Sequence, residues 1–125
     1  MATITNLQLD IKKGSSSSDV TVSYELCFSH CERLDETVFV ETITLRGDDP
    51  ISDDHLTTIS NTCVKATKAC IKRKFTRKVN NSVLNEDPKI LWVKQSDEVY
   101  ARVALLPFNP SSTSSNSNIV NSYFD

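Results

Sequence analysis

Glycine is scarce in this sequence, and long apolar runs are missing from it. Only two of its 125 residues are glycine, whereas the loops that cradle nucleotide phosphates place several glycines within a few residues. This composition excludes the common phosphate- and dinucleotide-binding loops. No stretch approaches the roughly 20 apolar residues of a membrane-spanning helix, and the first residues lack the basic start and apolar run of a secretion signal. We therefore expect no membrane span and a cytoplasmic location.

An excess of charge of one sign is also missing. The net charge is −2, so the field of the whole molecule gives no reason to expect attraction to nucleic acid or anionic membrane. Hydrophobic residues make up 38% of the chain and charged residues 24%, which is ordinary for a globular protein that folds by itself. The length predicts a single β-rich domain over residues 1–110. A Ser/Asn-rich tail, residues 111–125, is expected to dock on the domain or on a partner.

Alternating apolar and polar residues are the strongest structural pattern. They occur over residues 5–11 and again over 20–28, which is the period of half-buried strands. Residues 38–45 are rich in β-branched and aromatic types, so Asp19–Arg46 predicts an antiparallel hairpin. Its second arm is apolar on both faces, which suits a central strand or a bulge. A further strand pair is predicted over Ile90–Lys94 and Val99–Leu106.

The middle of the chain, Ser52–Leu84, fits two interpretations. Read as a helix, it has an apolar stripe at spacings of three and four, formed by Leu56, Ile59, Cys63, Ala66 and Cys70. Its density of β-branched residues favours two strands instead. In the strand interpretation Ile71, Phe75 and Val79 share one face.

These patterns together predict an all-β fold, an antiparallel β-sandwich of about seven strands. The alternative is an α+β fold with one helix near residues 53–79 packed on an antiparallel sheet. The predicted core consists of Leu7, Leu9, Ile11, Val20, Val22, Tyr24, Leu26, Phe28, Ile43, Leu45, Ala101, Val103 and Leu105.

The four cysteines, Cys27, Cys31, Cys63 and Cys70, are expected to be reduced thiols in a cytoplasmic protein. Cys27 and Cys31 would lie about 13 Å apart on a strand, too far to share one zinc ion. Cys63 and Cys70 would lie about 10 Å apart on a helix and farther on a strand. We therefore expect no metal, no cofactor and no catalytic residues, with a small Cys/His enzyme or metal protein as the least favoured function.

A basic segment is the least random feature of the sequence. No acidic residue lies between His55 and Leu84, and this region holds half of all lysine and arginine. The predicted partner-binding residues are Lys65, Lys68, Lys72, Arg73, Lys74, Arg77 and Lys78. The favoured function is a non-catalytic interaction module that binds an acidic protein or a second copy of itself, with the acidic residues Asp48, Asp49, Asp53 and Asp54 as one complementary surface. Binding to nucleic acid or an anionic surface through the basic segment is the alternative.

Overall fold

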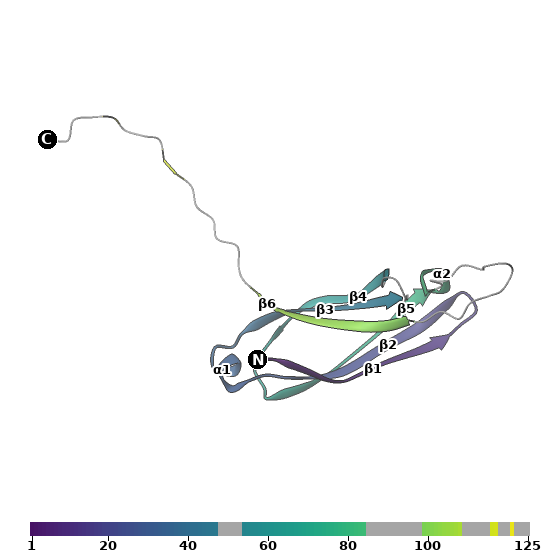
Figure 1. Ribbon diagram of the computed structural model, residues 1–125, viewed down its shortest axis with the longest axis horizontal. Coiled ribbons are helices and arrows are strands. Elements are labelled where there is room, and N and C mark those ends of the chain that lie inside the picture. The colour runs from purple at the N-terminus through teal and green to yellow at the C-terminus, as the bar shows by residue number, and fades with distance from the viewer. Residues whose placement is uncertain (48–53, 85–98, 109–115, 118–120, 122–125) are drawn as a thin grey trace.

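The computed structural model describes residues 1–47, 54–84, 99–108, 116–117 and 121, most of which form two antiparallel sheets (Figure 1). The first sheet has the strand order β1-β2-β5 and the second the order β4-β3-β6. The elements are β1 (Thr3–Lys13), β2 (Ser17–Cys27), α1 (His30–Leu34), β3 (Val38–Gly47), β4 (Asp54–Lys65), β5 (Cys70–Asn80), α2 (Asn81–Leu84) and β6 (Val99–Pro107). The fold is therefore all-β, as predicted, with two short helices in addition, and its described residues include six strands.

The hydrophobic core is centred on the middle strand of each sheet. Along β2 every second side chain is buried, as the alternating sequence predicts. Phe28 and Phe39 stack with ring centroids 5.6 Å apart, which joins the end of β2 to β3. The predicted core residues that are buried are Val20, Val22, Tyr24, Leu26, Phe28, Ile43 and Leu45, and those partly buried against them are Leu9, Ile11, Ala101, Val103 and Leu105.

Leu7 is the one predicted core residue that lies outside the core, with 41% of its surface exposed. The pairing of β1 with β2 shifts between Thr5 and Gln8, and Asn6 has a positive φ of 54°. A bulge of this kind adds a residue to one strand and reverses its alternation. Ile4, on the N-terminal side of the bulge, consequently packs against the core.

The ambiguous middle of the chain forms two strands, β4 and β5, so the helix interpretation is wrong. A helical stripe would bury Cys63, Ala66 and Cys70 on one face, but only Ala66 is buried and both cysteines are exposed. The β-branched residues of this region lose less side-chain freedom in a strand than in a helix. Their density therefore outweighs the apolar stripe.

The predicted hairpin of residues 19–46 is also wrong, because β2 and β3 belong to different sheets. Helix α1 turns the chain between them, and it starts with a capping box. The Glu32 carboxylate accepts from the Ser29 backbone N–H at 2.8 Å, and the Glu32 N–H donates to the Ser29 hydroxyl at 3.2 Å. The central position predicted for residues 38–45 is confirmed, since β3 lies between β4 and β6.

Some predictions fall on residues outside the described ranges. These include the Ile90–Lys94 strand, most of the tail 111–125, and Asp48, Asp49 and Asp53. The neighbouring strand β6 forms where it was predicted and pairs with β3. Within the described ranges no helix has the length and apolar character to cross a membrane.

Candidate binding face

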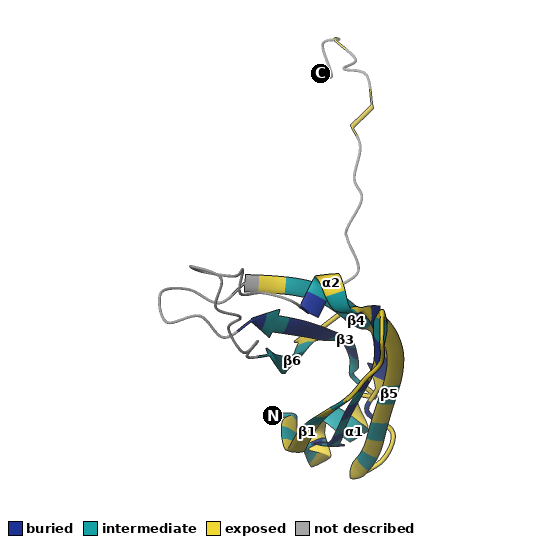
Figure 2. Ribbon diagram, turned by 90° about the vertical axis from the view of Figure 1, so that its right-hand side faces the viewer, coloured by how far each residue is buried: buried dark blue, intermediate teal, exposed yellow. Residues whose placement is uncertain are grey.

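The alternation of β5 divides the predicted basic residues between two faces of the first sheet. Arg73 and Arg77 lie opposite Tyr24 and Val20 of β2, on the side that faces the second sheet. Lys72, Lys74 and Lys78 lie on the opposite side, here called the outer face, and all three are exposed. In Figure 2, β5 carries exposed residues along much of its length. Lys65 ends β4, and Lys68 lies in the turn that follows. The seven residues therefore do not form one surface.

Arg73, which is half-buried, forms an ion pair with the buried Glu41 that connects the two sheets. Its Nη2 donates to Oε1 of Glu41 at 2.6 Å, and its Nε donates to Oε2 at 3.1 Å. Glu41 lies on β3 and has no exposed surface. The Tyr24 hydroxyl donates to Oε2 of the same carboxylate, and the Thr62 hydroxyl donates to Oε1 at 3.4 Å. A buried charge is tolerated only when it is paired and hydrogen-bonded, and Glu41 meets both conditions.

This cluster changes the acid–base properties of its members. Burial raises the pKa of Tyr24 far above its ordinary value of 10.0, and the hydrogen bond to the Glu41 carboxylate raises it further. The same carboxylate raises the pKa of Arg73 through its hydrogen bonds. Tyr24 is therefore a permanent donor to Glu41 in the folded protein, and Arg73 a permanent cation.

The raised pKa of Tyr24 predicts a loss of stability in alkaline solution. Above about pH 10 an unfolded tyrosine releases its proton while the folded one keeps it, so the unfolded state binds fewer protons and stability falls as pH rises. Relative to Tyr24→Phe, wild type is expected to lose up to about 1.4 kcal/mol of unfolding free energy per pH unit there. Urea denaturation of both proteins from about pH 9 to 11 measures this difference. Parallel pH profiles would contradict it.

The other basic residues differ in whether they have an acidic partner. Arg77 donates to the backbone carbonyl oxygen of Thr58 on β4. Lys65 pairs with Glu36 at 3.0 Å, and Lys78 pairs with Asp19 at 3.7 Å. Among the described residues, Lys68, Lys72 and Lys74 form no ion pair. Two of these three, Lys72 and Lys74, are next to each other on the outer face.

A shallow pocket of about 380 Å³ lies at these two lysines. Lys72 and Lys74 supply cations from β5, and Ser23 and Glu25 supply a hydroxyl and a carboxylate from β2. The remaining lining residues are Asn6 and Gln8 of the β1 bulge, together with Tyr24 and Arg73. The bulge that exposes Leu7 thus also brings two amide side chains to the pocket. The pocket is rich in hydrogen-bond donors, and besides Arg73, which pairs with Glu41, its charged residues are two lysines and one glutamate.

Charge on the outer face is balanced away from the pocket. At the other end of the sheet Asp10 and Asp19 lie on the same face as Lys12 and Lys78, two carboxylates for two lysines. Opposite charges directly across a pair of strands attract and offset each other. In the pocket Glu25 opposes Lys72, but Lys74 opposes the uncharged Ser23. With two lysines and one glutamate, the pocket therefore carries the surplus of positive charge on this face.

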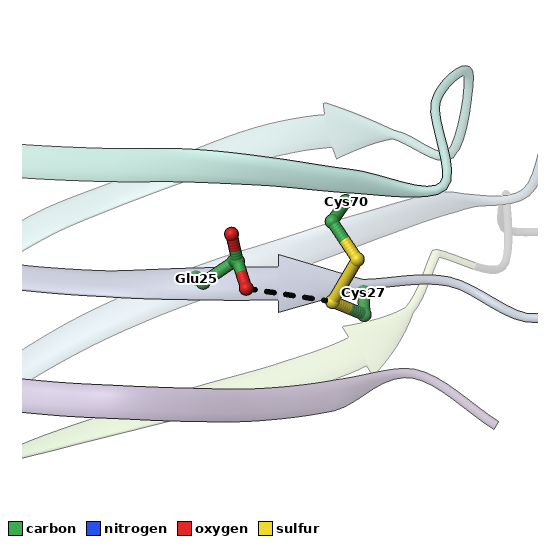
Figure 3. Close-up of side chains that lie close together, drawn as sticks. All are labelled: Glu25, Cys27 and Cys70. Atoms are coloured by element: carbon green, nitrogen blue, oxygen red, sulfur yellow. Dashed lines mark hydrogen bonds between the residues drawn. A yellow bond between two sulfur atoms is a disulfide. The ribbon is translucent and has the colours of Figure 1, made fainter.

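A disulfide between Cys27 and Cys70 lies at the end of the same face (Figure 3). The two cysteines are direct partners in the register of β2 and β5, with Cα atoms 4.1 Å apart. The expectation of four reduced thiols is thus not met for this pair, whereas Cys31 and Cys63 are free. The reason is the strand register, which places residues 43 apart in sequence side by side.

Sequence reasoning missed both the Glu41 ion pair and the Cys27–Cys70 contact. Glu41 interrupts an apolar strand, and a charge in such a strand indicates a buried partner without naming it. Comparisons with family models, curated proteins and solved structures found no match for this chain.

Proposed function

We propose that this protein is a non-catalytic binding module that holds an acidic segment of a protein partner on the outer face of the β1-β2-β5 sheet. The observation that carries the proposal is the coincidence of the pocket with two exposed lysines that have no ion-pair partner among the described residues. The amides of Asn6 and Gln8 and the hydroxyl of Ser23 add donors for carboxylate oxygens. We propose a cytoplasmic location for this interaction.

The side chains that line the pocket favour a carboxylate-bearing segment over a nucleic acid. Binding to single-stranded nucleic acid uses aromatic side chains on which bases stack, and the only aromatic lining residue, Tyr24, is buried with its hydroxyl bonded to Glu41. Glu25 would repel a closely spaced row of phosphates, whereas a peptide can place its carboxylates beside the lysines alone. We therefore take an acidic protein as the partner, and a second copy of this chain is one such protein.

The lysines of the pocket can be tested with a matched pair of double variants. Lys72→Gln/Lys74→Gln removes the two pocket cations, and Lys12→Gln/Lys78→Gln removes two cations from the far end of the same face. Both variants change the net charge equally. We expect the first to weaken binding of a fluorescent glutamate-rich peptide about 5- to 30-fold, since each exposed ion pair contributes up to about 1 kcal/mol. The second is expected to bind like wild type in fluorescence anisotropy at low ionic strength.

The alternative outcomes are distinguishable in the same experiment. Equal weakening by both variants, or no binding of the peptide by wild type, would contradict the proposal. Tighter binding of a single-stranded oligonucleotide of equal charge would favour the nucleic-acid function instead. Light scattering during size-exclusion chromatography reports whether the acidic partner is another copy of the chain.

A further inference from the structure

The disulfide at the end of the outer face has a carboxylate beside it. Glu25 precedes Cys27 by two residues on β2, so both side chains lie on the same face of the sheet. Sγ of Cys27 lies 3.9 Å from Oε1 of Glu25, and the ligand atoms of Glu25, Cys27 and Cys70 all lie within 4.8 Å of one another. Figure 3 shows Glu25 directed along the strand toward the sulfur atoms.

We propose that reduction of this disulfide creates a zinc site formed by Glu25, Cys27 and Cys70. Tetrahedral zinc holds thiolate sulfur at about 2.3 Å and carboxylate oxygen at about 2.0–2.2 Å, so its ligand atoms lie roughly 3.5–4 Å apart. The three atoms are already close to this spacing once the sulfur atoms are free to separate. Thiolate ligands select zinc over magnesium and calcium. Three protein ligands leave a fourth position for water or for a group from a partner.

The disulfide is accessible to a reductant. Cys70 is exposed and Cys27 half-buried, and exposed disulfides are the more easily reduced class. The Phe28 N–H donates to the Ala69 carbonyl oxygen at 2.8 Å, so the backbone on both strands stays paired beside the cysteines whether or not the sulfur atoms are bonded. The site can therefore open without separation of β2 from β5.

The reaction is a thiol–disulfide exchange followed by metal binding. A dithiol reductant attacks one sulfur, the Cys27–Cys70 bond breaks, and a mixed disulfide forms with the attacked cysteine. The second thiol of the reductant then releases that cysteine, so two electrons and two protons pass to the protein and the reductant becomes a disulfide. Zinc displaces the two thiol protons, which are released to solvent. Lys72, which opposes Glu25, offsets the net negative charge of two thiolates and a carboxylate on one zinc ion.

Cobalt spectroscopy of the full chain tests this site. The exposed free thiols are first removed by Cys31→Ser/Cys63→Ser, so that only the Cys27–Cys70 pair remains. After reduction with a phosphine under anaerobic conditions, we expect one Co²⁺ per chain, with a sulfur-to-cobalt charge-transfer band and tetrahedral ligand-field bands. One equivalent of Zn²⁺ is expected to remove these bands. The oxidised protein is expected to show none of them.

Replacement of the carboxylate distinguishes this ligand set from a simple dithiol. Because loss of an outer-shell group costs roughly 10–100-fold in metal affinity, loss of the Glu25 ligand in Glu25→Gln is expected to weaken Co²⁺ binding at least about tenfold. Glu36→Gln, the same change at an exposed glutamate that pairs with Lys65, is the matched control and is expected to bind like its parent. Absence of the charge-transfer band after reduction, or equal affinity in Glu25→Gln and its parent, would overturn the proposal.

Discussion

Replacing Arg73 by methionine is expected to lower the unfolding free energy by about 3–5 kcal/mol, because it leaves the Glu41 carboxylate buried without its cation. Methionine keeps much of the arginine's apolar volume, so lost packing contributes little to this effect. Urea denaturation measures it directly. The effect is large because Glu41 has no exposed surface, so water cannot solvate its carboxylate when the cation is removed.

A double variant distinguishes the cost of leaving the Glu41 charge unpaired from the loss of the other contacts of Arg73. Glu41→Gln/Arg73→Met removes both charges and leaves an amide oxygen that can accept from Tyr24. We expect it to recover most of the stability lost in Arg73→Met, since replacing both members of a buried ion pair is far less costly than removing one. Equal instability of the single and double variants would contradict the assigned role of the ion pair.

Ile43→Ala is expected to lower the unfolding free energy by about 2–5 kcal/mol, because Ile43 is fully buried on β3 between the two sheets. The adjacent Thr42 points to the other side of the same strand, where its hydroxyl donates to Asn61 at 3.4 Å. Thr42→Ala is therefore the matched control and is expected to change stability by no more than about 0.5 kcal/mol. Denaturation curves in urea give both values.

This pair of substitutions tests the strand assignment as well as the packing. Neighbouring residues on a strand point to opposite faces, so the two effects are expected to differ severalfold. Similar losses from Ile43→Ala and Thr42→Ala would be incompatible with β3 as the central strand of its sheet.

The fold could be predicted wherever local alternation decides the structure. Residues 20–28 alternate without interruption, and they form the most buried strand of the first sheet. The predictions of the fold fail where the structure depends on a single residue or on a contact between residues that are distant in sequence. The positive φ of Asn6 reverses the alternation at Leu7, and the capped helix at Ser29 sends β3 to the other sheet. Neither event changes the apolar pattern on which the prediction relied.

The candidate site was only partly predictable, for a related reason. The density of positive charge in residues 65–78 is visible in the sequence, but its division between two faces depends on strand alternation in a segment that also fitted a helix. Once β5 is a strand, Arg73 must face inward and Lys72 and Lys74 outward. The Cys27–Cys70 and Arg73–Glu41 contacts depend on the register and on how the two sheets lie against each other, which no local pattern specifies.

Amide chemical-shift mapping is the most direct test of the proposed binding face. A glutamate-rich peptide is titrated into ¹⁵N-labelled protein, and the shifted backbone amides are assigned. The predicted result is a contiguous set of shifts at Asn6, Gln8, Ser23, Lys72 and Lys74, with little change along β3. Shifts concentrated on the β4-β3-β6 sheet, or no shifts at low ionic strength, would contradict the proposal that the outer face of the first sheet binds an acidic partner.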